Sequence, residues 1–501
     1  MSASRAGRTD NADSTNSADS TDSTDNADNA DNADNADNAD NADNADSTDS
    51  TAAPVHHLSH RRDLAVRAAV RQGLVDERRP VAGLLDVAAL RERAAALRAA
   101  FDDVSAPGTT ALHAFAVKAA SLVPVLRLLR DAGLGAEVAS PGELALARAA
   151  GVPPERIVLD SPAKTTEELR EALRLGVAVN ADNPQELARL DALVPEFDQQ
   201  PPIGLRVNPQ LGAGSINAMS TATATSKFGV PLRDAGAREE VRRAFLARPW
   251  LSRLHVHSGS QGVPPELMAE GVAAGHELAE EVNAAAGRRQ VTGIDIGGGL
   301  PVDFTTDEPA DDFAAYAALL RRRVPGLFDG RYALVTEFGR ALAAKAGTVL
   351  ARVEYTKSAG GRAIAVTHAG AQTAVRTVFA PDAWPLRVLT YDAAGGVKTT
   401  SGARGVVQDV AGPCCFAGDL VATGRELPEL APGDLVALPD TGAYYFSTPF
   451  GYNSLPRPGV YGFTVDRFGE VRFATVRRAQ TLAEIVAEAG GAHDDALTAL
   501  R

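Results

Sequence analysis

Residues 156–193 read RIVLDSPAKTTEELREALRLGVAVNADNPQELARLDAL and contain one pattern twice. In each copy a short apolar run is followed by a longer stretch in which apolar residues recur at helical spacing, so we predict a strand and then a helix. Thr165 and Asn183 are suitable caps for the two helix starts. The strands are expected at 156–160 and 177–181, and the helices at 166–175 and 184–193.

The same alternation extends in both directions, from about residue 110 to about residue 345. It predicts six further strands, at 114–119, 136–139, 203–208, 254–258, 293–297 and 334–337, and further helices at 123–132, 142–150 and 265–286. Eight strands alternating with helices are the number in a closed parallel (β/α)8 barrel of the TIM type. A doubly wound open sheet is the alternative, but the count of eight favours the barrel.

The sequence changes character after about residue 346, where Val, Thr, Gly and Pro dominate and turn signals such as 394–396 and 432–434 recur. This change favours an antiparallel β domain. We therefore predict an α/β protein with five parts. They are a disordered tail (1–54), an N-terminal segment that adds to the β domain (55–92), the barrel (93–345), the C-terminal β domain (346–478) and a helical tail (479–501).

Most of the net charge of −14 belongs to the tail, because the first 54 residues hold 13 Asp and 2 Arg. The tail consists largely of Asn-Ala-Asp repeats with almost no apolar side chain larger than Ala, so burial cannot offset the entropy cost of ordering it. The rest of the chain is close to neutral and has no basic patch. We therefore expect no nucleic-acid partner.

The sequence also bears on the cellular compartment. No cationic start leads into an apolar core, as a signal peptide would require, and no apolar run approaches the length of a membrane span. The only cysteines, Cys414 and Cys415, are adjacent and make no disulfide framework. We expect a cytoplasmic protein that does not bind a membrane.

Lys118 is one of only six lysines, and it follows the apolar run His113-Ala-Phe-Ala-Val117. An amine at the end of a buried strand has a lowered pKa and becomes nucleophilic toward carbonyl carbons, as a Schiff-base lysine must be. The same residue could instead extend its amine into solvent.

Chemistry in a parallel barrel takes place at the carboxyl ends of the strands. The predicted strand ends carry an amine, acids, an imidazole, arginines and a triple glycine, at Lys118, Glu137, Asp160, Asp182, Arg206, Asn208, His257, Gly297–Gly299, Glu337 and Arg340. A triple glycine alone can be a tight turn, but on the seventh strand it favours a phosphate site, because backbone amides can approach a phosphate there.

Several motifs together resemble the fold type III pyridoxal-phosphate decarboxylases, which include the ornithine, arginine and diaminopimelate decarboxylases. In chain order the motifs are Phe115–Lys118, Ser226–Gly229, His255–Ser260, Gly297–Gly299, Glu337–Arg340, Gly412–Asp419, Asp440–Tyr444 and Tyr452-Asn453. The resemblance covers about residues 90–465. Each motif is weak alone, and the eight in order are specific.

The resemblance implies a role for each cofactor residue. Lys118 would bind pyridoxal 5'-phosphate covalently, Glu337 would keep the ring nitrogen protonated, and His257 would stack on the ring. The phosphate would be bound by Ser260, Gly298, Gly299, Arg340 and Tyr444. Glu143 matches an acid that supports the Lys118 region. The resemblance implies no metal.

The resemblance also implies a homodimer with shared active sites, because Cys415 matches a catalytic cysteine that protonates Cα across the subunit boundary. The substrate would be a small amino-acid-like molecule in contact with Arg376, Phe416 and Tyr452. Arg376 matches an arginine that reads a substrate carboxylate in diaminopimelate decarboxylases.

The chain departs from the family in two places that concern the substrate. Phe416 stands where decarboxylases of basic amino acids have an acid that binds the distal amine, and His368 falls near another acidic position. A phenyl ring cannot accept a hydrogen bond from an ammonium group as a carboxylate does, although it could offer a cation–π contact. We therefore predict a decarboxylase with an altered substrate pocket.

Departures near the cofactor are smaller: Ala120 replaces a usual Asn, Glu137 a usual Asp and Phe338 a usual Pro.

Two other functions stay open. One is an amino-acid racemase or epimerase of the same fold, for which Tyr444 or Tyr445 could supply the second base. The other is a non-catalytic protein that binds pyridoxal phosphate, but such proteins lack a second domain.

Overall fold

The computed structural model describes residues 57–308, 312–400 and 405–500. The predicted tail, 1–54, lies outside the described residues. No helix in the described part of the chain combines the length and apolar character needed to cross a membrane.

The predicted barrel is confirmed. Eight parallel strands pair in the order β5-β4-β3-β2-β10-β9-β8-β6, and pairing of β5 with β6 closes the ring. The strands are β2 (Ala111–Ala116), β3 (Gly135–Val138), β4 (Ile157–Asp160), β5 (Ala178–Ala181), β6 (Ile203–Asn208), β8 (Leu251–Val256), β9 (Gly293–Asp295) and β10 (Ala333–Thr336), with the short β7 (Val230–Pro231) beside β6.

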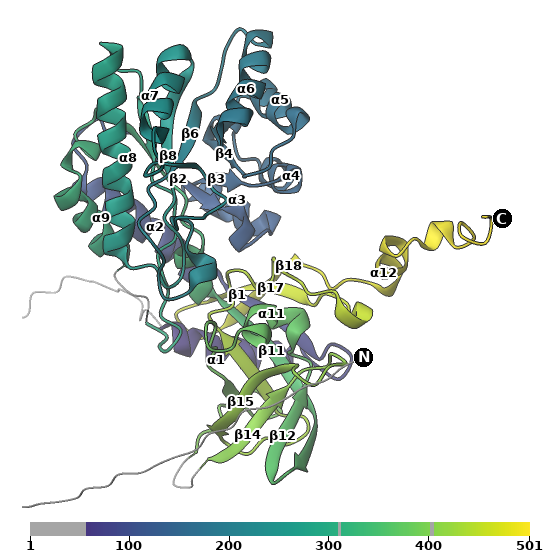
Figure 1. Ribbon diagram of the computed structural model, residues 1–501. Helices are drawn as coiled ribbons and strands as arrows, with labels where there is room; N and C mark the ends of the chain where they lie inside the picture. The colour runs from purple at the N-terminus through teal and green to yellow at the C-terminus, as the bar shows by residue number, and fades with distance from the viewer. Residues whose placement is uncertain (1–56, 309–311, 401–404, 501) are drawn as a thin grey trace, which may run out of the picture. The chain divides into compact units, whose positions relative to one another are not determined.

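Helices surround the barrel strands (Figure 1). They are α2 (Val87–Val104), α3 (Val123–Asp131), α4 (Pro141–Ala149), α5 (Thr166–Leu175), α6 (Pro184–Leu193), α7 (Ala237–Ala247), α8 (Pro265–Ala286) and α9 (Asp312–Arg323), followed by the short α10 (Arg340–Ala343). Thr165 and Glu168 form a reciprocal capping box at α5, and the Asn183 side chain accepts from the Glu186 amide at α6. These caps explain why both helices begin where the sequence predicts.

The second sheet has nine strands in the described part of the chain. Seven of them pair in the order β15-β14-β12-β11-β1-β17-β18, and β16 pairs with β11 and with β13. Its strands are β1 (Val81–Asp86), β11 (Gly347–Ala359), β12 (Arg362–Thr367), β13 (Leu389–Tyr391), β14 (Val406–Ala411), β15 (Leu420–Leu427), β16 (Leu435–Pro439), β17 (Gly459–Val465) and β18 (Val471–Arg477). Most pairs are antiparallel, as predicted, but β1–β17 and β12–β14 are parallel.

Three helices belong to this part of the chain: α1 (Leu58–Arg71), α11 (Ala371–Phe379) and α12 (Leu482–Glu488). Helix α1 packs on β17 and β18, and Val66 of α1 shares a small core with Leu84 and Phe463. A much larger core runs without interruption from the barrel into the second sheet. The two sheets are therefore parts of one packed unit.

The structure corrects the position of Lys118. The first barrel strand ends at Ala116, and Lys118 lies in a single 3-10 turn, Val117–Ala119, directly after it. The ring of strands is complete by Ala116, so the following residues turn toward α3. This turn places Lys118 at the rim of the barrel and not within a strand.

Candidate active site

Lys118 and Glu137 form an ion pair at the carboxyl end of the barrel. The Lys118 Nζ donates to Glu137 Oε2 at 2.5 Å, and Glu137 is fully buried in β3. Burial would lower the pKa of Lys118, but the charges of Glu137, Tyr444 and Glu337 outweigh it and raise that pKa. The expectation of a lowered lysine pKa is therefore wrong, because the sequence did not reveal that these acids converge on the amine.

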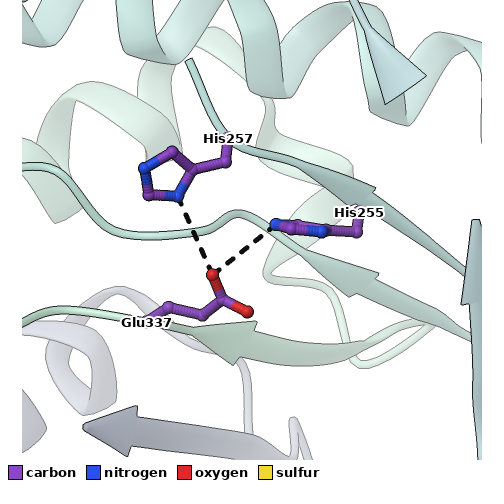
Figure 2. Close-up of side chains that lie close together, drawn as sticks. All are labelled: His255, His257 and Glu337. Atoms are coloured by element: carbon purple, nitrogen blue, oxygen red, sulfur yellow. Dashed lines mark ion pairs between the residues drawn. The ribbon is translucent and has the colours of Figure 1, made fainter. Parts of the chain in front are cut away.

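Glu337 lies between two imidazoles (Figure 2). Its Oε2 is 3.8 Å from His257 Nδ1 and 3.6 Å from His255 Nε2, and its Oε1 is buried without a hydrogen-bond partner among the described residues. Burial, together with Asp295, Asp160 and Glu137, raises the pKa of Glu337 well above its usual range. A cationic N–H donor at the free oxygen would favour its ionised form.

His255 was not singled out from the sequence as a site residue. Its Nδ1 lies 3.5 Å from Asp160 Oδ1, so its buried ring lies between Asp160 and Glu337, within ion-pair distance of both acids but outside hydrogen-bonding geometry. The signal was present in His255-Val-His257, because side chains two apart on a strand point to the same face. The histidines and Glu337 place ligand atoms within 4.8 Å of one another, a spacing that a metal ion could also span; the absence of a metal stays a prediction.

Other strand-end residues organise the rim. Arg206 donates to Asp160 at 3.2 Å, and together with His255 it lowers the pKa of Asp160 despite burial. Asp182 accepts from the Gly229 amide, and Asn208 donates to the Thr223 carbonyl. Asp182 and Asn208 therefore hold the 223–229 loop in place. Glu143, in the first turn of α4, accepts from the Ala139 amide at 2.7 Å.

The triple glycine is packed too tightly for side chains. A Cβ on Gly298 would overlap the Glu337 backbone, and one on Gly299 would overlap the backbone of Gly259, next to Ser260. Gly299 also has φ of 101°, a conformation that side chains disfavour. The Gly298 amide donates to His257 Nδ1 at 3.1 Å. The glycines thus let the ends of β8, β9 and β10 approach one another.

Two arginines lie beside Tyr444 near the rim. Arg340 and Arg376 each lie over the rings of Trp384 and Tyr444, at 4.5–5.1 Å from the ring centroids. Neither pairs with an acid in the described part of the chain, and Arg340 Nε and Arg376 Nη1 are buried without hydrogen-bond partners there. Burial lowers the pKa of Arg340 to about 10. Two neighbouring cations without acids form a binding site for anions.

The second sheet's loops reach the Lys118 turn. The Tyr444 amide donates to the Ala119 carbonyl at 2.7 Å, and Ser447 Oγ donates to the Lys118 carbonyl at 2.8 Å. Tyr444 has φ of 66°, an unfavourable conformation for a tyrosine that these contacts maintain.

Cys415 lies on an exposed loop between β14 and β15. Its amide donates to Asn453 Oδ1 at 2.8 Å, and Tyr452 Oη donates to its carbonyl at 3.4 Å. Asp419 shapes the loop by accepting from the amides of Cys414 and Ala371. Burial raises the pKa of the Cys414 thiol to about 11, so Cys414 stays neutral. His368 is turned toward Glu354, at 3.6 Å.

The comparisons with known proteins agree with this geometry. Residues 87–344 match the family described as "Pyridoxal-dependent decarboxylase, pyridoxal binding domain". The diaminopimelate decarboxylase of Methanothermobacter thermautotrophicus is 34% identical over 352 residues, which cover 69% of this chain and 78% of that protein. That of Actinosynnema pretiosum subsp. auranticum is 33% identical over 395 residues, covering 76% and 83%.

The chain belongs to the pyridoxal-dependent decarboxylase family.

A solved structure supports the same assignment. Diaminopimelate decarboxylase from Helicobacter pylori, complexed with L-lysine, superposes with a TM-score of 0.70 and 25% identity over 82% of this chain and 97% of that one. The protein is therefore a carboxy-lyase that uses pyridoxal phosphate to decarboxylate an amino acid. The racemase and the non-catalytic alternatives are not favoured.

The residues of this decarboxylase fit its cofactor. The phosphate is an anion, and the unpaired Arg340 guanidinium beside the Tyr444 ring suits it. The buried free oxygen of Glu337 suits a protonated ring nitrogen. The Lys118 amine, on the same rim, suits the covalent link.

Proposed function

We propose that this decarboxylase removes the α-carboxylate of an amino-acid-like substrate whose distal end lacks the ammonium group that diaminopimelate, lysine and ornithine carry there. One observation carries the proposal: Phe416, beside Cys415, presents a ring in contact with Tyr452 where the resemblance places an acid. The reaction is proposed from the relatives, which are named as decarboxylases of diaminopimelate.

In this proposal the barrel residues bind and orient the cofactor. Lys118 holds it covalently, Glu337 binds the ring nitrogen and His257 lies against the ring. Ser260, Gly298, Gly299, Arg340 and Tyr444 bind the phosphate. When bound, pyridoxal phosphate supplies an electron sink for the electron pair that remains when CO2 leaves. Glu137, at 2.5 Å, accepts the proton that Lys118 must lose to react.

The loops of the second sheet act on the substrate. Arg376 is available for a substrate carboxylate, because its guanidinium has no acid partner in the described part of the chain. Cys415 donates a proton to Cα after CO2 has left, and Tyr452 lies next to it.

We further propose that the enzyme is a cytoplasmic homodimer in which Cys415 of one subunit serves the Lys118 site of the other. The exposure of Cys415 and of Tyr452 supports this arrangement, since both are available to a second subunit. Two free thiols suit a reducing compartment.

The test is mass spectrometry of the purified holoenzyme in D2O with a panel of D- and L-amino acids. Loss of CO2 with one deuterium incorporated at Cα is the expected result. Deuterium at Cα with the carboxylate retained would assign a racemase instead. Efficient turnover of ornithine, with no turnover of bulkier substrates, would contradict the altered pocket.

A further inference from the structure

Four aromatic rings form a closed cluster beside Cys415, which we call the aromatic quartet: Phe379, Phe416, Tyr452 and Phe450. Phe379 stacks on Phe416 at 5.5 Å between centroids, and Phe450 stacks on Tyr452 at 5.8 Å. The two stacked pairs meet edge to face, at 5.6 Å for both Phe416–Tyr452 and Phe379–Phe450. Each ring therefore contacts two others.

The quartet combines segments that are distant in the sequence. Phe379 ends α11, Phe416 follows Cys415, and Phe450 and Tyr452 lie in the loop before β17. The whole chain has only 16 Phe, 8 Tyr and 2 Trp, so four rings in mutual contact are a marked local enrichment.

Much of the quartet faces solvent in the single subunit. Phe379 is 59% exposed and Tyr452 is 41% exposed. Exposed apolar patches of this kind are typical of binding sites. Asn453 and Ser454 adopt φ of 59° and 52°, so the backbone that carries the Asn453 and Tyr452 side chains to Cys415 is strained. Strain of this kind is common at functional sites.

We propose that the aromatic quartet binds the distal end of the substrate side chain, and that this end is an aromatic group rather than an ammonium group. The proposal rests on the proposed function, in which Cys415 reaches Cα of the substrate. A substrate side chain begins at Cα, so it must pass the residues that surround Cys415. Those residues include Phe416 and Tyr452.

The chemistry of the quartet favours an aromatic group over a cation. None of its four side chains carries a charge, so an ammonium group there would lose hydration and gain cation–π attraction in place of a hydrogen-bonded carboxylate. An aromatic group would instead extend the stacked and edge-to-face packing that the rings already have. Phe450 also lines a cavity of about 320 Å3 with Leu455 and Ile485, which has room for a bulky group. The same wall includes Arg457 and Glu488, whose charges pair with each other at 3.5 Å.

Two matched amines test this inference. Cadaverine ends in an ammonium group, whereas in N-benzoylcadaverine one amine carries a benzoyl group and the other is free to react at the cofactor. Both are titrated into the holoenzyme, and binding is read from the absorbance of the bound cofactor. We expect N-benzoylcadaverine to bind at least 10-fold more tightly, a preference within reach of a few aromatic contacts.

Two variants locate the preference in the quartet. Phe416→Glu introduces a carboxylate, and we expect it to shift the ratio of the two dissociation constants at least 10-fold toward cadaverine. Phe450→Ser removes a ring without adding charge, and we expect it to weaken only the benzoylated amine. Phe468→Glu is the matched control, because Phe468 is 76% exposed between β17 and β18 and should leave the ratio unchanged.

The possible failures can be distinguished. Equal binding of the two amines, or tighter binding of cadaverine, by the unmodified enzyme overturns the inference and leaves the decarboxylase intact. If the variants change the sedimentation of the enzyme but not the ratio of the two dissociation constants, the quartet is a contact between subunits only, and the inference is wrong. If neither amine changes the cofactor absorbance, the proposed function fails as well.

Discussion

At the rim of the barrel, Lys118, Glu137 and Glu337 lie among other charged groups, whereas Cys415 and Phe416 lie among aromatic rings on an exposed loop. The rim groups are held by strand ends whose backbone is fixed by the closed sheet. The loop is held by a few side-chain bonds, such as the one from the Cys415 amide to Asn453. We infer that the rim provides the cofactor chemistry, which is the same for many substrates, and that the loop determines which substrate binds.

Loss of the rim amine should have the largest effect. Lys118→Ala is expected to abolish the absorbance of the covalently bound cofactor and to lower kcat by at least about 1,000-fold, because nucleophile and positioning are lost together. Absorbance spectra and CO2 release measure both. A cofactor that stays covalently attached in this variant would refute the assignment of the rim.

Cys415→Ala should distinguish the role of the loop in turnover from the role of the rim in cofactor binding. We expect the cofactor absorbance to persist while kcat falls about 100- to 1,000-fold, because only the proton donor to Cα is removed. Cys414→Ala is the control, since that thiol is buried and donates to Gln372 Oε1 of α11, so its loss should affect kcat little. Equal losses in the two variants would contradict the role of Cys415.

A more moderate change would refine the description of the rim. His255→Gln breaks the connection from Asp160 to Glu337, and we expect kcat to fall about 10-fold with little change in KM, since leaving a buried acid poorly paired costs about 1–3 kcal/mol. The pH dependence of the cofactor absorbance should shift as well. His276→Gln, on α8 beside Glu280, is a matched control outside the barrel interior. An unchanged absorbance profile would show that His255 only fills space.

The smallest effect concerns stability, and it should originate in the barrel. Burial lowers the pKa of His113 to about 4, and its Nδ1 lies 3.0 Å from Thr336 Oγ1. The unfolded chain therefore binds more protons between pH 6.5 and 4, so the free energy of unfolding should fall by about 2 kcal/mol as the pH drops through this window. Urea unfolding at pH 7 and pH 4.5 measures it. In His113→Asn the free energy of unfolding should depend less on pH, because the contribution of His113 is lost. An unchanged pH dependence in this variant would contradict the assignment to His113.

The sequence predicted the two regions unequally. Helices such as α5 and α6 were predicted to the residue, because caps and apolar periodicity are local signals. The position of Lys118 was two residues beyond the true strand, and the direction of its pKa shift was missed, since Glu137 and Glu337 approach it only through barrel closure. For His255 a local signal exists, because its spacing of two residues from His257 places both side chains on the same face.

The aromatic quartet shows where sequence information ends. Phe379, Phe416 and Phe450 are separated by more than thirty residues from one another, and nothing in their neighbours indicates that their rings meet. Phe416 could be singled out because it replaces an acid, but its partners required the three-dimensional structure.

Strand β1 has a consequence for how the chain is made. It lies in the middle of the second sheet, between β11 and β17, with Ala82 opposite Leu350 on one side and Gly459 on the other. At about 5–20 residues per second, a ribosome needs on the order of 20–75 s to reach Gly459 after Ala82. An apolar strand thus awaits β11 while the whole barrel is synthesised, and it awaits β17 for the full interval. Removing residues 81–86 would therefore delete the middle of a sheet rather than trim one end of the protein.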